Sequence, residues 1–285
     1  MTADHTTPAT DAPDAAPNDP LARGLAHERR GDLLSAAACY RDVLARTPDH
    51  PEAVYRLGCV LRKSGDLAAA AGAFRRAVAL RPEDPRAWTN LGAVLEALGE
   101  RDEAVRMYRK ALLLDPHSTQ ALHNLGALHA EQGRYAEAVR CFRAALAEAP
   151  DAEIHHNLGL VHLARAELDA ALACFRQAHR LDPAAAPPVF QAAVALMRKG
   201  LYAEAVTWFD RALELDRRLT RAHFHRGVCL HRLSRYREAL HSLRLALEAY
   251  PDDSRLHYQL ALTYDALLQP REARDHYRLA RRAEA

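Results

Sequence analysis

A motif of about 34 residues recurs along almost the whole chain, and this spacing limits the fold more than any other feature of the sequence. With register one placed at Pro51, register twenty is alanine in all eight copies. These alanines are Ala36, Ala70, Ala104, Ala138, Ala171, Ala205, Ala239 and Ala273. Such a period is typical of arrays in which each unit is a pair of helices that packs against its neighbours.

Two further registers carry residues of a constant kind. Register eight is small: Gly24, Gly58, Gly92, Gly126, Gly159, Ala193, Gly227 and Ala261. Register twenty-four is large: Tyr40, Phe74, Tyr108, Phe142, Phe175, Phe209, Leu243 and Tyr277. Small residues let two antiparallel helices approach closely, and the large side chain fills the space beside them. Most copies close on a proline, which cannot continue a helix, so we predict one helical hairpin per copy.

These registers resemble the tetratricopeptide repeat family over residues 17–285. The resemblance implies an all-α fold, a right-handed α-solenoid of eight helix-turn-helix repeats with an inner and an outer wall. We place the repeats near 17–50, 51–84, 85–118, 119–151, 152–185, 186–219, 220–253 and 254–285. Residues 1–18 are rich in Pro, Ala, Thr and Asp, so we expect a disordered tail before a solenoid at 19–285.

Two arginines distinguish the last repeat from the others. Register twenty-one, which faces the following repeat, is apolar in seven copies and becomes Arg274 in the eighth. Register twenty-eight is apolar in all copies but two, His179 and finally Arg281. A terminal repeat needs a polar outer face, so we expect the solenoid to be complete at its C-terminus and the protein to be a monomer.

Composition limits the partners and the compartment. The formal net charge is +2, and register two alternates in charge, so we expect no nucleic-acid partner. No apolar run is long enough for a membrane span, and the N-terminus does not resemble a secretory signal. The five cysteines include no C-x-x-C pair and suit a reducing compartment. We therefore expect a cytoplasmic protein without a membrane partner.

No catalytic motif occurs in the sequence. Phosphate-loop, zincin and serine-hydrolase patterns are absent, so we expect no enzyme activity and no cofactor. A metal-dependent enzyme that uses groove histidines is the remaining enzymatic alternative. Histidines in neighbouring repeats generally lie too far apart to share a metal ion, so we expect no metal site. His129 and His162 share register eleven, where we expect them to be satisfied core residues.

Register six carries amides, and in this family it points toward the inner wall. It reads Ala22, Arg56, Asn90, Asn124, Asn157, Gln191, His225 and Gln259. An amide can satisfy a peptide N–H and C=O together, so such a ladder suits binding of an extended main chain. The asparagines resemble the ladder in the repeat superhelix of O-GlcNAc transferase, which implies peptide binding by Asn90, Asn124 and Asn157. Alternatively, asparagine before Leu-Gly belongs to the repeat consensus for reasons of the helix alone.

Neighbouring registers would add side-chain specificity to the ladder. Register five reads Tyr55, Thr89, His123, His156, Phe190, Phe224 and Tyr258. We predict an anchor for an apolar or aromatic ligand side chain at Phe190, Phe224 and Met197. The alternative is that these rings pack between adjacent helices. Arg221 and Arg255 would select an acidic neighbour of that side chain.

The sequence therefore predicts a non-catalytic adaptor whose concave groove holds an extended segment of a partner protein. The alternative is a subunit that recruits substrates in trans for a separate enzyme, such as a glycosyltransferase or a secretion apparatus.

Overall fold

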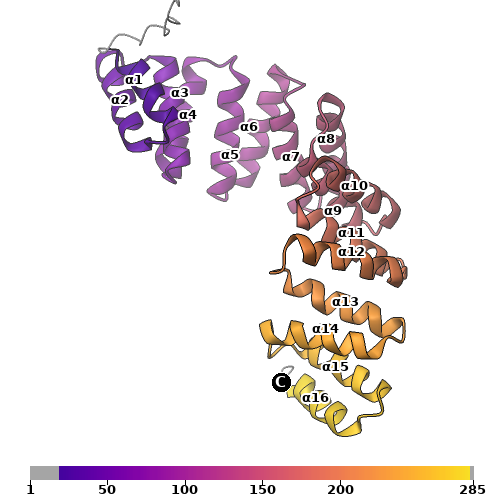
Figure 1. Cartoon of the computed structure of the whole chain (residues 1–285). Helices are drawn as coiled ribbons and strands as arrows, with labels where there is room; N and C mark the ends of the chain where they lie inside the picture. Colours follow the sequence, from indigo (N-terminus) through magenta and orange to yellow (C-terminus); the bar gives the residue numbers. More distant parts are fainter. Residues whose placement is uncertain (1–18, 283–285) are drawn as a thin grey trace, which may run out of the picture. The chain divides into compact units, whose positions relative to one another are not determined.

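The computed structural model describes residues 19–282, and the expected tail at 1–18 lies outside them. The described residues form sixteen helices and no strand, which confirms the all-α prediction (Figure 1). The first eight helices are α1 (Pro20–Arg29), α2 (Leu33–Arg46), α3 (Pro51–Lys63), α4 (Leu67–Leu80), α5 (Pro85–Ala97), α6 (Arg101–Leu114), α7 (Thr119–Glu131) and α8 (Tyr135–Glu148). The other eight are α9 (Ala152–Ala164), α10 (Leu168–Leu181), α11 (Ala186–Arg198), α12 (Tyr202–Leu215), α13 (Thr220–Arg232), α14 (Tyr236–Ala249), α15 (Ser254–Ala266) and α16 (Pro270–Arg282).

The third hairpin, α5 and α6, shows how the sequence sets the ends of the helices. Pro85 occupies the first turn of α5, where its missing N–H costs no hydrogen bond. The Asp84 carboxylate caps the helix by accepting a hydrogen bond from the backbone N–H of Arg86 at 3.0 Å. Beyond α5, Gly99 has a φ of 85°, a left-handed conformation that glycine adopts without strain, and the chain reverses there into α6.

Close contact between the two helices of each hairpin follows the small and large registers. A Cβ atom built on Gly92 would lie 2.7 Å from Cε1 of Tyr108, and one on Gly159 would lie 2.6 Å from Cε1 of Phe175. Both rings are fully buried. The prediction that small residues admit the large side chain is therefore confirmed for these hairpins.

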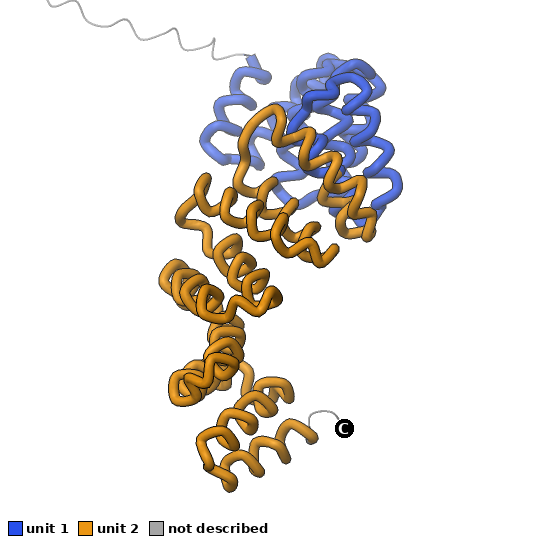
Figure 2. The backbone as a smooth tube through the Cα atoms, turned by 90° about the vertical axis from the view of Figure 1, so that its right-hand side faces the viewer, with its two compact units in different colours: residues 1–125 blue, residues 126–285 orange. Residues whose placement is uncertain are grey.

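The described helices belong to two compact units, which divide within α7 between Leu125 and Gly126 (Figure 2). In unit 1 (residues up to 125), Tyr40 of the first hairpin and Val60 of the second share one buried cluster. In unit 2 (residues from 126), Phe175 and Phe209 from successive hairpins also share a cluster. Within each unit, consecutive hairpins thus bury their apolar faces against each other, as in a solenoid.

The two arginines expected to give the last repeat a polar face, Arg274 and Arg281, are both exposed. Among the described helices, none has the length and apolar character that a membrane span needs.

Candidate functional site

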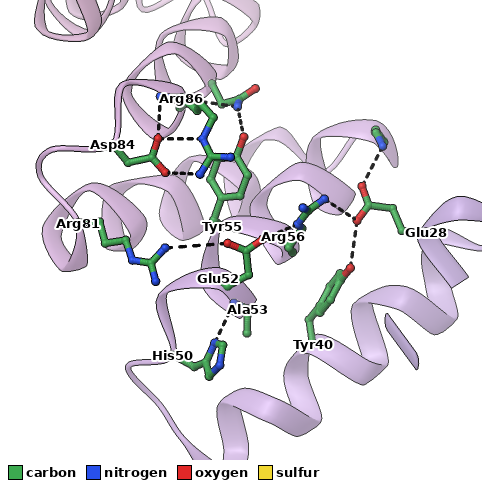
Figure 3. Close-up of polar contacts among 12 residues, drawn as sticks. Glu28, Tyr40, His50, Glu52, Ala53, Tyr55, Arg56, Arg81, Asp84 and Arg86 are labelled. Atoms are coloured by element: carbon green, nitrogen blue, oxygen red, sulfur yellow. Dashed lines mark hydrogen bonds and ion pairs between the residues drawn. The ribbon is translucent and has the colours of Figure 1, made fainter. Parts of the chain in front are cut away.

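In unit 1 the Asn90 amide is occupied by groups of the protein itself. Its Nδ2 donates to the Tyr55 hydroxyl and to the carbonyl oxygen of Arg86, both at 3.0 Å. Asn90 is 8% exposed. The Arg86 guanidinium lies over the Tyr55 ring at 5.3 Å and forms two hydrogen bonds with Asp84, at 2.9 and 3.0 Å (Figure 3). Both donor hydrogens of Asn90 are therefore used within the fold, and only its Oδ1 is left for an additional partner.

A charged network occupies the same register one repeat earlier. Arg56 donates from Nε to Glu52 at 2.7 Å and lies 3.7 Å from Glu28 (Figure 3). Glu28 also accepts hydrogen bonds from the Tyr40 hydroxyl and Lys63 Nζ, each at 3.0 Å. Burial opposes the charge on Glu28, but the hydrogen bonds from Lys63 and Tyr40 outweigh it and lower the pKa of the carboxyl group. Register six thus contributes one ion pair between hairpins here, from Arg56 of α3 to Glu28 of α1.

Asn124 is the last member of the predicted ladder in unit 1. Its side chain forms a hydrogen bond with the hydroxyl of Tyr108, the buried ring at register twenty-four of the preceding hairpin. The Tyr108 hydroxyl in turn donates to Glu96 at 2.6 Å. His123, at register five beside it, is half-buried. Both asparagines of unit 1 therefore bond a tyrosine of the preceding hairpin.

The first register-six residue of unit 2 is Asn157, which lines a cavity. The cavity has a volume of about 380 Å³ and is otherwise lined mainly by apolar side chains, including Leu160 and Val161. The neighbouring His156 packs against the Phe175 ring with a centroid separation of 5.7 Å. Burial lowers the pKa of His156, so the neutral imidazole is favoured.

The predicted anchor of Phe190, Phe224 and Met197 is divided between two apolar clusters. Phe190 and Met197 pack against the cluster that contains Phe209, whereas Phe224 packs against the next cluster along the chain. Phe190 lies 5.8 Å from the rings of both Phe209 and His225, so it packs between adjacent hairpins. The packing alternative therefore describes Phe190, and Phe224 packs against a different cluster from Phe190 and Met197.

His225 replaces the amide at register six and lies inside an aromatic cluster. Its ring is stacked on Phe209 at 5.8 Å and meets the edge of Phe224 at 5.2 Å. Burial, and then the positive charge of Arg221, lower the pKa of His225. Gln191, the preceding residue of this register, is half-buried on α11. The imidazole is thus held neutral among rings rather than presented as a cation.

Two cavities gather most of the remaining predicted residues. The first has a volume of about 300 Å³, and Arg221, Phe224, His225 and Arg255 contribute to its lining. The second has a volume of about 550 Å³ and is lined by Phe224, Arg255, Tyr258 and Gln259, among others. The cavities share Phe224 and Arg255, so they adjoin each other. They form the part of unit 2 in which predicted aromatic, basic and amide residues meet.

Sequence reasoning missed four residues of the larger cavity, which are Ser254, Tyr277, Ala280 and Arg281. Tyr277 belongs to register twenty-four, whose other members are fully buried. Within the described chain no helix follows α16, and Tyr277 is only half-buried. The sequence did contain an indication of this site, because Arg281 is a polar residue at a register that is mostly apolar.

Among residues 19–282, no group of three or more histidine, cysteine, aspartate or glutamate side chains gathers that could hold a metal ion. His129 and His162 are 2% and 4% exposed, which confirms their expected place in the core. Nδ1 of His162 lies 2.5 Å from the Glu167 carboxylate.

The architecture defines a class, an array of antiparallel helical hairpins stacked through a constant set of registers. Family models described as tetratricopeptide repeat match residues 21–85, 55–119 and 190–254, residues 97–158 and residues 152–185. The chain belongs to the tetratricopeptide repeat family, whose members are typically non-catalytic scaffolds for protein interactions. A comparison with curated proteins finds no match.

Solved structures of similar fold include several tetratricopeptide repeat proteins. YrrB, described as having an unusual peptide-binding site, is 27% identical with a TM-score of 0.58; the match covers 64% of this chain and 94% of YrrB. PilF of Pseudomonas aeruginosa is 24% identical with a TM-score of 0.62, covering 73% of this chain and 94% of PilF. A protein from Parabacteroides merdae is 18% identical with a TM-score of 0.62, covering 86% of this chain and 97% of its own.

Proposed function

We propose that the protein is a non-catalytic adaptor that binds an extended peptide segment of a partner protein, with unit 2 providing the principal contacts. The observation that carries this proposal is the pair of adjoining cavities that share Phe224 and Arg255. Each combines aromatic surface with polar groups, the usual composition of sites that bind peptide side chains. The resemblance to YrrB, whose description names a peptide-binding site, agrees with it.

The amides of unit 2 would bind the peptide main chain. Gln259 lines the larger of the two cavities, and Asn157 lines the cavity at α9. In an asparagine ladder like that of O-GlcNAc transferase, each such side chain would both donate a hydrogen bond to the peptide and accept one from it. In unit 1, Asn90 could offer only its Oδ1, because its amino group is bonded to Tyr55 and Arg86. We therefore expect Asn90 to bind a peptide main chain through its Oδ1 alone.

Selection of peptides from a random display library tests this function. The selected peptides are synthesised with a fluorescent label, and their dissociation constants are measured by fluorescence anisotropy for the wild-type full chain and for variants. Tyr258→Ala removes a ring that is 49% exposed, so it should weaken binding without unfolding the protein. We expect a loss of about tenfold or more, typical of an aromatic residue at the centre of an interface.

Arg237→Gln serves as the matched control, because Arg237 is exposed on α14 and lines neither cavity. Circular dichroism and thermal unfolding establish that the variants are folded. Failure to select any binding peptide, or equal affinity of wild type and Tyr258→Ala for all selected peptides, would contradict the proposed function.

Recruitment of a substrate for a separate enzyme would use the same cavities. Co-purification of an enzyme with the full chain, lost on Tyr258→Ala, would identify this alternative.

A further inference from the structure

The larger cavity of unit 2 is built by three helices. Phe224 comes from α13, Tyr258 and Gln259 from α15, and Tyr277 and Arg281 from α16. Its volume of about 550 Å³ exceeds what one side chain fills and lies within the range of sites for small ligands. It can therefore hold more than one group of a bound peptide.

The rings form an apolar wall that is still partly exposed. Tyr258 and Tyr277 meet edge to face with a centroid separation of 5.9 Å. The Tyr277 hydroxyl donates to Asp265 at 2.7 Å, which fixes the orientation of the ring. Phe224 is held from behind by the buried cluster that contains Leu256. Because these rings are held in place, a ligand side chain packing on them would require little further ordering.

The polar part of the cavity is positively charged. Its lining includes Arg255 and Arg281 and no aspartate or glutamate. Within residues 19–282, neither guanidinium takes part in an ion pair with a carboxylate.

Two nearby carboxylates, Asp253 and Asp265, accept hydrogen bonds from other groups. Asp253 accepts hydrogen bonds from the backbone N–H groups of Arg255 and Leu256, at 2.8 and 3.1 Å. Asp265 accepts the hydrogen bond from Tyr277. Among residues 19–282, the fold thus brings two cationic side chains to one cavity without a carboxylate partner, so that a ligand can complement their charge.

We propose that this cavity binds a carboxylate group that directly adjoins a large apolar side chain of the bound peptide. This inference rests on the proposed function and specifies the chemistry of the ligand. Arg255 and Arg281 bind the carboxylate through charge-assisted hydrogen bonds, for which the planar guanidinium is well suited. Phe224, Tyr258 and Tyr277 pack against the apolar side chain. The carboxylate belongs either to an Asp or Glu side chain or to the C-terminus of the partner.

Rings together with arginines can also bind a base and its phosphate. A nucleic-acid strand would require the positive charge to continue beyond the cavity. The positive charge continues only to Arg221 of the adjoining cavity, where Asp253 also contributes to the lining, and the preceding residues of register two are Pro187 and Glu153. The balance of charge therefore favours a peptide carboxylate, and a nucleic-acid ligand becomes an outcome of the test.

The test uses four fluorescent forms of the peptide Gly-Ser-Gly-Ser-Asp-Phe and the full chain. The forms carry Asp or Asn before the phenylalanine and end in a free carboxylate or an amide. We expect the neutral form, with Asn and a C-terminal amide, to bind about tenfold more weakly than at least one charged form, in an ionic-strength-dependent manner. Comparison of the two singly charged forms identifies the source of the carboxylate.

Variants then assign the effect to the two arginines. Arg255→Gln/Arg281→Gln should reduce the affinity for the charged forms to that for the neutral form and leave the latter unchanged. Arg255→Lys/Arg281→Lys should give an intermediate loss, since it keeps the charge but not the planar donors. Arg237→Gln is the control for loss of one positive charge. Because the substituted residues are exposed, circular dichroism should show no loss of helix.

Three results would overturn the inference. The first is equal affinity for charged and neutral forms, or no binding of any form. The second is a loss on Arg255→Gln/Arg281→Gln that is the same for all four forms. The third is displacement of the peptides by an oligouridylate that binds more tightly than any of them. If peptides from the unbiased display selection still bind in a Tyr258-dependent manner, only this inference fails and the proposed function stands.

Discussion

Units 1 and 2 use one hairpin design with different side chains between the hairpins. In unit 1, polar side chains link successive hairpins, as in the bonds of Glu28 with Lys63 and of Asn90 with Tyr55. In unit 2, aromatic and histidine rings occupy registers five and six, as where the His225 ring contacts Phe209 and Phe224, and polar links such as that of His231 with Thr263 occur beside them.

This difference between the units shows which registers are needed to form the hairpins and which can vary between hairpins. Registers eight and twenty-four hold the two helices of one hairpin together, so they keep the same kind of residue in both units. Registers five and six lie between hairpins and tolerate charge, amide or ring, provided that the neighbouring hairpin supplies a matching group. Two of the cavities of unit 2 occur where aromatic rings meet Arg221, Arg255 and Arg281.

The largest expected effect tests whether the hairpin design is common to both units. Phe74 in unit 1 and Phe209 in unit 2 are fully buried at the same register. We expect Phe74→Ala and Phe209→Ala each to lower the free energy of unfolding by about 3–5 kcal/mol, through lost burial and a residual cavity. Urea denaturation followed by circular dichroism measures the change. Leu34→Ala, at a side chain that is 84% exposed, should change it by less than about 0.5 kcal/mol.

A large effect in only one unit would show that the two do not share a common design.

Lowering the pH should destabilise unit 2 before unit 1, because different groups titrate in the two units. In unit 2, burial lowers the pKa of His156, His225 and His276, so folding favours their neutral forms. The stability they contribute is fully present above the unfolded pKa of about 6.5 and is lost as the pH falls toward the folded values. Glu28 of unit 1 has a lowered pKa, so its contribution is lost only below its unfolded value of 4.5, as the pH falls through the folded pKa.

We therefore expect α13 to lose hydrogen-exchange protection before α3 as the pH is lowered, after correction for intrinsic exchange rates. His225→Phe keeps a ring among Phe190, Phe209 and Phe224 and removes one titrating group, so it should reduce the acid sensitivity of α13. Loss of protection in α3 at the higher pH would reverse the proposed difference between the units.

The smallest expected effect concerns the turns inside the hairpins. Gly99 in unit 1 and Leu268 in unit 2 both have positive φ, 85° and 59°, but only glycine adopts this conformation without strain. Leu268 is 88% exposed, so its side chain contributes little packing. We expect Leu268→Gly to raise the free energy of unfolding by about 0.5–1 kcal/mol, whereas Gly99→Leu should lower it by a similar amount or more. Thermal unfolding compares the two, and a destabilised Leu268→Gly would show that the left-handed turn carries no strain.

The sequence predicted the hairpins well because their contacts are local. Gly58 and Phe74, or Gly159 and Phe175, lie on consecutive helices joined by a short turn, so a small residue and a ring at fixed spacing are sufficient to predict their contact. The burial of His129 was predictable for the same reason, since its register lies between the two helices of one hairpin.

The surface residues were less predictable because their environment depends on a neighbouring hairpin. The amino group of Asn90 donates a hydrogen bond to the Tyr55 hydroxyl. A residue without a hydroxyl group at position 55 would have left that donor hydrogen available. Phe190 and Phe224 share one register, yet Phe190 packs between Phe209 and His225 while Phe224 lines two cavities. Tyr277 was assigned to the core by its register, but its exposure depends on what covers α16 rather than on its own hairpin.

The bond between Asn90 and Tyr55 also has a mechanical consequence. It joins α5 to α3 across two successive hairpins, and the bond of His231 with Thr263 joins α13 to α15 in the same way. Hydrogen bonds act only over short distances and within a narrow range of angles. Rotation of one hairpin against the next must therefore break these hydrogen bonds, so they stiffen the two hairpins that each of them joins.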